Sequence, residues 1–222
     1  MPDVALSSNR PVRYVSWFAG VGGGDLALKL ALGNAVCIGY VERETAIAEI
    51  LAARITEGAL DDAPIWSDMR TWPSQLYRGR VDLALCAAPC QPYSCAGKQL
   101  GEKDDRYLWD YVFAGIEGCQ PAMVFLENVP GLLRFFRPIA ERFSQLAYRI
   151  EAGLFSAAEV GASQARCRLF ALAYRAGARH HDAGEHVQPP LLLRTRSEQC
   201  GGELADPRHG LIQEPGPEPQ GG

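Results

Sequence analysis

The feature that most constrains the fold is a short apolar strand followed by a glycine-rich loop and a helix. Residues 13–18 (R-Y-V-S-W-F) predict the strand, residues 19–25 (A-G-V-G-G-G-D) the loop, and the L-A-L-K-L-A-L run that follows predicts the helix. Glycines let a backbone approach a ligand closely, and a helix start offers unpaired N–H groups to polar ligand atoms. Strand, glycine loop and helix in this order are typical of the cofactor-binding start of a doubly wound α/β fold.

Further apolar runs predict more strands, and several of them end at a polar or reactive side chain. The runs cover residues 35–41, 81–88 and 122–126, and a fourth strand follows residues 164–168. We also expect helices after residue 42, from residue 108 and over residues 134–150. Ligands bind beyond the carboxyl ends of strands in open α/β sheets, where Glu42, Cys90 and Glu127 fall. We therefore expect a Rossmann-like, mixed but mostly parallel sheet with helices on both faces.

Composition limits the function classes. The chain has 222 residues, a net charge of −4 and no global basic character, so a nucleic-acid partner needs a local basic face. No apolar run approaches the ~20 residues of a membrane span, and the first ten residues lack a signal-type core. We expect a cytoplasmic protein whose seven cysteines are reduced. The spacing of Cys86, Cys90 and Cys95 does not match a zinc site, so no metal is expected.

The chain divides into three parts by composition. Residues 1–12 form a leader and residues 13–178 hold the predicted strands, helices and polar tips. Residues 179–222 are rich in Gly and Pro and poor in apolar side chains, which predicts a flexible tail.

Cys90 lies on a loop stiffened by Pro89 and Pro92, because proline fixes its own φ angle. Such a loop suits an aimed nucleophile, and it equally suits a small buried apolar residue in a turn. The glycine loop is not a dinucleotide G-x-G-x-x-G, because Asp25 stands where the third glycine belongs. That departure disfavours an NAD-dependent oxidoreductase.

Four motifs occur in register along the chain. F-x-G-x-G-G begins at Phe18, P-C-Q at Pro89, E-N-V at Glu127 and Q-x-R-x-R at Gln164. With these motifs the chain resembles the cytosine-5 DNA methyltransferase family over about residues 12–175. The resemblance implies transfer of a methyl group from S-adenosyl-L-methionine to C5 of a cytosine flipped out of duplex DNA, with no metal.

The resemblance also implies roles for individual residues. Cys90 would add to cytosine C6, Glu127 would protonate or hydrogen-bond N3, and Arg166 with Arg168 would hold the base and the DNA backbone. Residues implied at the cofactor are Phe18, Ala19, Gly20, Gly22, Gly23, Glu42, Arg43, Asp68, Met69, Pro89 and Leu108. Residues implied at DNA are Gln91, Ser94, Lys98 and Arg106.

Three of these roles, those of Glu42, of Glu127 and of the two arginines, are also supported by the residues themselves. Glu42, at the tip of the second strand, is placed to accept hydrogen bonds from ribose hydroxyls. We expect Glu127 in an apolar pocket, where its pKa would be raised and it would donate a proton near neutrality. Arg166 and Arg168 at alternate strand positions would point the same way.

The chain departs from the family after Q-x-R-x-R. No target recognition region and neither of the last two family motifs is identifiable in the 43 residues after Arg179. The chain would then be the catalytic half of a split enzyme with a partner, a truncated and weakly active or inactive form, or a compact form with relaxed sequence preference. An RNA cytosine-5 methyltransferase and a non-catalytic nucleic-acid-binding remnant remain alternatives.

Overall fold

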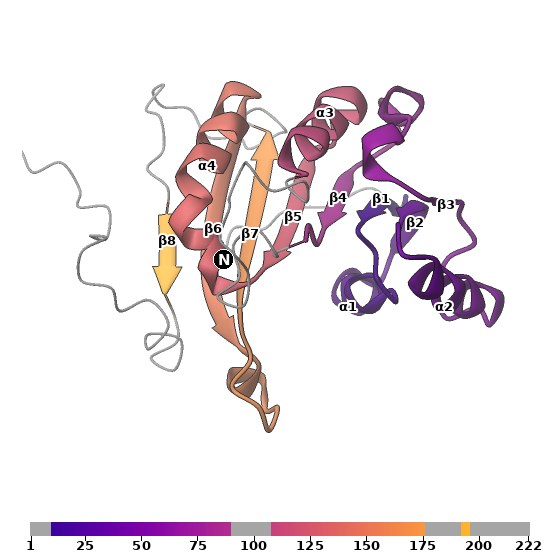
Figure 1. The fold of residues 1–222 in the computed structure, drawn as a ribbon, viewed down its shortest axis with the longest axis horizontal. Coiled ribbons are helices and arrows are strands. Elements are labelled where there is room, and N and C mark those ends of the chain that lie inside the picture. Colours follow the sequence, from indigo (N-terminus) through magenta and orange to yellow (C-terminus); the bar gives the residue numbers. More distant parts are fainter. Residues whose placement is uncertain (1–9, 90–107, 176–191, 196–222) are drawn as a thin grey trace, which may run out of the picture.

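A computed structural model describes residues 10–89, 108–175 and 192–195, the last four as backbone (Figure 1). The strands are β1 (Val12–Trp17), β2 (Ala35–Val41), β3 (Ile65–Trp66), β4 (Leu83–Cys86), β5 (Met123–Asn128), β6 (Tyr148–Ser156), β7 (Cys167–Arg175) and β8 (Leu192–Thr195). The helices are α1 (Gly23–Leu32), α2 (Thr45–Thr56), α3 (Trp109–Cys119) and α4 (Phe136–Gln145). Short 3-10 turns are η1 (Met69–Thr71), η2 (Ser74–Tyr77), η4 (Pro130–Phe135) and η5 (Ala157–Val160).

The strands form one eight-stranded sheet in the order β3-β2-β1-β4-β5-β7-β6-β8. β1 pairs in parallel with both β2 and β4, and β4 pairs in parallel with β5. β7 is inserted antiparallel between β5 and β6. The expected doubly wound, mixed and mostly parallel sheet is confirmed, and the strand order reverses at β1 and β4, where such folds bind ligands.

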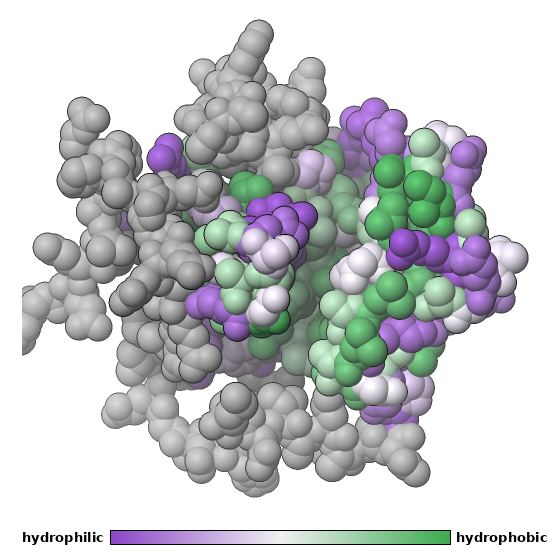
Figure 2. All heavy atoms as spheres, turned by 90° about the horizontal axis from the view of Figure 1, so that it is seen from below, coloured by the Kyte–Doolittle hydropathy of each residue, from purple (hydrophilic) through white to green (hydrophobic). Residues whose placement is uncertain are grey.

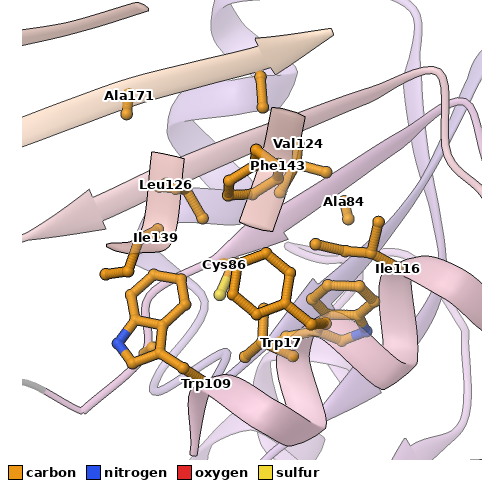
Figure 3. Close-up of a cluster of buried hydrophobic side chains, with 14 of the residues drawn as sticks. Trp17, Ala84, Cys86, Trp109, Ile116, Val124, Leu126, Ile139, Phe143 and Ala171 are labelled. Atoms are coloured by element: carbon orange, nitrogen blue, oxygen red, sulfur yellow. The ribbon is translucent and has the colours of Figure 1, made fainter. Parts of the chain in front are cut away.

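Helices cover both faces of the sheet. α1 and α2 lie on one side, and α3 and α4 lie on the other (Figure 1). Trp17 of β1, Trp109 of α3 and Phe143 of α4 are almost fully buried in the core of the α3–α4 side (Figure 3). Burying each such side chain stabilises the fold by roughly 2–3 kcal/mol, so the strand ends that carry the polar residues rest on a rigid base.

The predicted helix over 134–150 is wrong at both ends. η4 precedes α4, which ends at Gln145, and Ala147 then takes a left-handed φ of 62° that turns the chain back. Tyr148 and Ile150 belong instead to β6 and face the core, because a strand buries every second residue. The Tyr148 hydroxyl donates a hydrogen bond of 2.5 Å to the Pro121 carbonyl, which fixes the start of β6.

Part of the predicted tail belongs to the sheet. β8 pairs in parallel with β6, with Glu151 opposite Leu192. The segment carries the apolar L-L-L run of residues 191–193, and the edge of β6 gives the backbone of β8 a pairing partner. The boundary at residue 178 therefore does not separate the whole sheet from the tail.

The α1–α2 side of the sheet carries aromatic residues on β5, β7 and β6. Phe170 stacks on Phe125 with ring centroids 5.7 Å apart and meets Phe155 edge-on at 5.8 Å. Phe155 is 40% exposed and Leu172 is 36% exposed. Figure 2 views the molecule from this side and shows hydrophobic residues among hydrophilic ones on its surface. None of the helices that the structure describes has the length and apolar character needed to cross a membrane.

Candidate cofactor and substrate site

The glycine loop turns sharply where β1 ends. Phe18 has a φ of 57°, a conformation that costs a non-glycine residue roughly 1 kcal/mol or more and that collects at functional sites. Gly22 has a φ of 80°, and a Cβ there would lie 2.4 Å from Leu60 Cδ1. The Ala19 N–H donates to the Val41 carbonyl at 3.0 Å, so the loop is anchored to β2. α1 begins directly after the loop and leaves its first N–H groups free for a ligand.

Glu42 stands at the carboxyl end of β2, as predicted, and it contacts the loop. Its Oε2 accepts a hydrogen bond of 2.8 Å from the Gly20 N–H, and its Oε1 accepts one of 2.8 Å from the Glu44 N–H. Each carboxylate oxygen retains a lone pair for an outside donor. Arg43, the next residue, is exposed. The loop and the carboxylate are thus held together before any ligand arrives.

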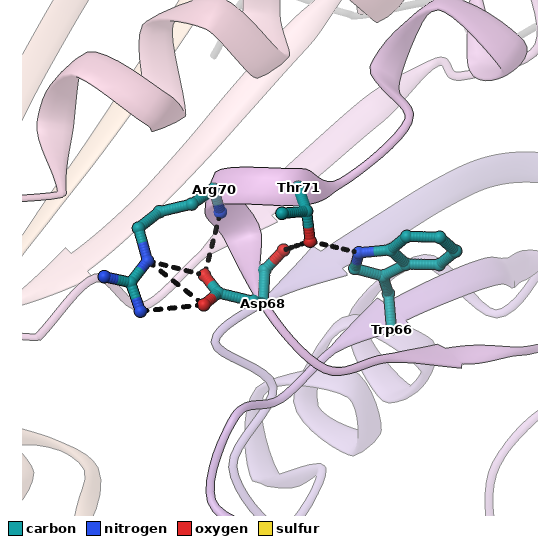
Figure 4. A network of polar contacts seen from close by, with 4 residues as sticks. All are labelled: Trp66, Asp68, Arg70 and Thr71. Carbon is teal, nitrogen blue, oxygen red and sulfur yellow. Dashed lines mark hydrogen bonds and ion pairs between the residues drawn. The ribbon is translucent and has the colours of Figure 1, made fainter.

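Asp68 precedes η1 and is held by a network of polar contacts (Figure 4). Arg70 donates to its carboxylate from the backbone N–H at 2.9 Å and from Nη2 at 2.8 Å. These hydrogen bonds and the guanidinium charge lower the pKa of Asp68 from its ordinary value. Trp66 Nε1 donates to Thr71 Oγ1 at 3.1 Å and braces the turn from the other side. Met69, the other residue expected here, is buried.

Pro89 follows β4, between the ends of β1 and β5. Ala87 N–H donates to the Trp17 carbonyl at 3.2 Å, and Asn128 Nδ2 donates to the Ala88 carbonyl at 2.9 Å. Asn128 is buried and also accepts from the Val129 N–H at 2.9 Å. Asn128 therefore ties the end of β4 to the end of β5. Asn128 was not predicted as a site residue, although its position beside Glu127 in E-N-V was the available signal.

Glu127 lies at the end of β5 and forms an ion pair with Arg168 of β7, with Oε1 3.0 Å from Nε. The Glu127 side chain is 34% exposed and that of Arg168 is 26% exposed. The prediction of an apolar pocket around Glu127 is therefore wrong for the part of the chain that the structure describes. The neighbouring antiparallel strand β7 places the Arg168 guanidinium against the carboxylate. The ion pair shows that the E-N-V and Q-x-R-x-R motifs lie together.

Arg166 was expected to lie on the same strand as Arg168, and it does not. β7 begins at Cys167, and Arg166 is exposed in the preceding turn. Its carbonyl accepts the Ala157 N–H at 3.0 Å, which pairs the two sides of the hairpin. No side-chain hydrogen bond fixes the Arg166 guanidinium to another described residue, so it is available to an outside anion.

Leu108 is the N-cap of α3, and its carbonyl accepts the Val112 N–H at 3.0 Å. Its predicted contact with a cofactor stays a prediction. Five predicted residues lie outside the described residues: Cys90, Gln91, Ser94, Lys98 and Arg106.

The described cysteines differ in state. Cys37, Cys86 and Cys119 are free and buried, and burial raises the pKa of Cys86 to about 12. Such a thiol is inert at neutral pH. Cys167 is disulfide-bonded, so the expectation of reduced thiols throughout is wrong there. Within the described ranges, no group of three or more His, Cys, Asp or Glu residues is arranged to hold a metal.

The chain is similar in sequence to type II methyltransferases. The chain is 32% identical over 166 residues to the type II methyltransferase M.NgoMIV of Neisseria gonorrhoeae, covering 71% of this chain and 50% of that protein. It is 30% identical over 212 residues to M.PspPI of a Psychrobacter species, covering 92% and 50%. The chain thus spans about half the length of these relatives.

Solved structures share the fold at low sequence identity. A Spodoptera frugiperda DNMT2 mutant matches with a TM-score of 0.63 and 17% identity, over 83% of this chain and 55% of that one. Schizosaccharomyces pombe Dnmt2 methyltransferase matches with a TM-score of 0.61 and 19% identity, over 78% and 52%. The family model for C-5 cytosine-specific DNA methylases matches residues 12–199. The chain belongs to the C-5 cytosine-specific DNA methylase family.

Proposed function

We propose that the chain transfers a methyl group from S-adenosyl-L-methionine to C5 of cytosine in DNA, through a covalent bond between Cys90 and cytosine C6. One observation carries the proposal. The glycine loop with Glu42 and the Glu127–Arg168 pair lie at the same edge of the sheet, on either side of the β4 end that leads through Pro89 to Cys90. The proposed cofactor and substrate sites thus flank the end of β4, and Cys90 follows that end in the sequence.

The cofactor site fits S-adenosyl-L-methionine. Glu42 has free lone pairs for ribose hydroxyls, and the first N–H groups of α1 suit polar atoms of the methionine part. The Asp68 carboxylate is fixed by Arg70 and suits the adenine amino group, beside the apolar Met69. The cofactor supplies an electrophilic methyl group. Nothing in this reaction requires a metal, and its absence stays a prediction.

Cys90 would act as the nucleophile. Cytosine C5 is not nucleophilic until a group adds to C6, and a thiolate is the reactive form of cysteine. When the Cys90 thiolate bonds to C6, electron density moves to C5, which would attack the methyl group. The S–CH3 bond then breaks, its electron pair stays on sulfur, and neutral S-adenosyl-L-homocysteine leaves. Loss of the C5 proton and expulsion of the Cys90 thiolate then restore the aromatic ring.

Glu127 and Arg168 would bind the polar edge of the flipped base. Addition at C6 places negative charge on the ring, and a proton or hydrogen bond from Glu127 at N3 would stabilise it. The base must first separate the existing Glu127–Arg168 pair or insert beside it, and Arg168 then donates to the base O2. The free guanidinium of Arg166 would contact a phosphate, and Gln91, Ser94, Lys98 and Arg106 would contact DNA.

A second chain that supplies target recognition belongs to this proposal. The exposed side chains of Phe155 on β6 and Leu172 on β7 support it, because sheets of this class are normally covered on both faces. An RNA cytosine-5 methyltransferase and a non-catalytic binding remnant stay alternatives. The cytoplasmic location, the domain at 13–178 and the cofactor contacts of Leu108 stay predictions.

Mass spectrometry of the chain after incubation with S-adenosyl-L-methionine and duplex DNA containing 5-fluorocytosine tests the proposal. Fluorine at C5 blocks the last elimination, so a competent enzyme stays bonded to DNA through Cys90. The Cys90→Ser variant is the matched control and should form no adduct while binding the cofactor within a few-fold of the wild type.

Each outcome decides between the alternatives. An adduct on Cys90 from the chain alone supports DNA cytosine-5 methylation and removes the need for a partner. An adduct formed only with 5-fluorocytosine RNA supports the RNA alternative. Cofactor binding without an adduct on either nucleic acid supports a remnant or a missing partner, and co-purification then separates those two.

A further inference from the structure

One buried ionisable group beside the cofactor loop has no place in the chemistry described so far. Asp25 is the third residue of α1, about one helical turn beyond Gly22, and its side chain is 0% exposed. The Ser16 hydroxyl donates to Asp25 Oδ2 at 3.0 Å. Besides Ser16, the polar group that faces the buried carboxylate is the hydroxyl of Tyr14, which also lowers the pKa of Asp25 by hydrogen bonding. A carboxylate buried with neutral hydroxyl donors and no cation is destabilising.

No described cation compensates the Asp25 charge. The groups that face it are Tyr14 and Ser16 of β1 and Cys37 and Tyr40 of β2, together with the more distant carboxylate Asp61. The nearby ammonium group of Lys29 is engaged with Asp61 at 2.7 Å. Tyr14 and Ser16 offer the carboxylate neutral hydroxyl groups and no positive charge.

Asp25 is nevertheless ionised at physiological pH. Burial raises its pKa to about 6, and the Ser16 hydrogen bond limits the rise. An asparagine would fill the same volume and accept the same hydrogen bond without a buried charge. A charge that costs stability and meets no cation among the described residues points to a cation outside them.

We propose that the Asp25 carboxylate is the buried counter-charge for a cationic cosubstrate held by the glycine loop, and that it sets the preference of the site for a sulfonium over a neutral thioether. The inference rests on the proposed function, which identifies the cosubstrate as S-adenosyl-L-methionine. That molecule carries a positive sulfonium, and the product S-adenosyl-L-homocysteine does not. The uncompensated charge therefore favours release of the product after methyl transfer.

Coulomb's law sets the expected change in affinity for a cationic ligand. In a partly buried site with an effective dielectric constant of about 20, opposite charges within about 10 Å change affinity by roughly tenfold. Partial solvent screening reduces this value. We expect a preference of about 3- to 10-fold to depend on Asp25.

Equilibrium binding to the full chain tests the inference. The ligands are S-adenosyl-L-methionine, S-adenosyl-L-homocysteine and sinefungin, which carries an ammonium group in place of the sulfonium. At pH 8, Asp25→Asn should weaken binding of the two cationic ligands by about 3- to 10-fold and that of the neutral thioether by less than about twofold. Asp62→Asn is the control: it removes an exposed carboxylate and should leave the ratio of affinities unchanged.

A second measurement needs no variant. In the wild type, lowering the pH from 8 to 5 neutralises Asp25 and should bring the affinities of the cationic ligands and the thioether closer together by the same factor. Asp25→Asn should remove the part of the pH dependence that belongs to this group.

The outcomes are separable. An equal loss of affinity for all three ligands in Asp25→Asn would show a structural role alone and overturn the inference. If the ratio of affinities for the cationic ligands and the thioether is unchanged in both the variant and the pH series, the inference is overturned too. The proposed function would still stand in that case, because the wild type binds the ligands. Failure of the wild type to bind any of the three ligands would overturn the proposed function as well.

Discussion

The two halves of the sheet prepare their polar groups in different ways. In the β1–β3 half, Glu42 is satisfied by two backbone N–H groups, and the loop it holds is anchored to β2. In the β5–β7 half, Glu127 is held by the side chain of Arg168, and both are partly exposed. Backbone contacts fix a carboxylate before a ligand binds, whereas an ion pair between side chains can open to admit a base.

The difference agrees with what each half would bind. A cosubstrate that is bound in every cycle favours a preformed cradle, because less ordering is needed on binding. A flipped base has to displace existing contacts. The cofactor half contains the parallel β1–β4 pair, and the substrate half contains the antiparallel β5–β7 pair. Variants in the two halves should therefore separate cofactor affinity from methyl transfer.

The largest effect is expected in the substrate half. Glu127→Gln should lower the rate of methyl transfer by about 10²- to 10⁴-fold, because the amide cannot protonate N3. Cofactor affinity should stay within about twofold of the wild type. Single-turnover kinetics with radiolabelled S-adenosyl-L-methionine measures the rate. Glu151→Gln, at an exposed position of β6, should transfer normally, and a similar loss in that variant would show that the effect is not specific to the site.

The next effect concerns stability in the cofactor half. Because the pKa of Asp25 is raised to about 6 in the folded state, the native protein binds that proton more tightly than the unfolded chain. Stability from this group is present below about pH 4 and is lost as the pH rises to about 6. Relative to Asp25→Asn, the wild type should lose up to about 3 kcal/mol over this range.

Urea unfolding of both proteins at pH 4.5 and pH 7.5 measures the Asp25 effect. If the difference in free energy of unfolding between the wild type and Asp25→Asn is the same at both pH values, the raised pKa of Asp25 is contradicted. The substrate half provides no equivalent among the described residues, because its carboxylate is paired and partly exposed.

Substitution of Glu42 should lower cofactor affinity more than substitution of a neighbouring residue. Glu42→Ala should weaken S-adenosyl-L-methionine binding by about 1–3 kcal/mol, the scale for losing hydrogen bonds to a partly buried polar group. Calorimetry measures the affinity. Glu44→Ala changes an exposed carboxylate two residues away and should leave it within about twofold. Equal losses in both variants would indicate a general charge effect instead of a ribose contact.

The smallest effect is expected at Arg70. The Arg70–Asp68 pair is partly exposed, so Arg70→Ala should change stability by less than about 1 kcal/mol. Without the guanidinium, the pKa of Asp68 should return toward its ordinary value, and Asp68 should lose its fixed orientation. Cofactor affinity should fall by about two- to threefold. A loss as large as that of Glu42→Ala would show that side chains also prepare the cofactor half.

Local patterns in the sequence determined much of this protein. The glycine loop, the apolar runs and the polar residues at their ends predicted the doubly wound sheet, the position of Glu42 and the family. These signals are local, because strand periodicity and the positive φ angles of the loop depend on residues close together in the chain.

Long-range contacts decided the rest. The end of the predicted 134–150 helix depended on core positions that β6 offered to Tyr148 and Ile150, and the edge of β6 brought residues 192–195 into the sheet. The partner of Glu127 came from a strand 41 residues later in numbering, at Arg168. The burial of Asp25 required β1 to lie under α1. Pairing partners and burial depend on residues distant in sequence, so only the tertiary structure assigns them.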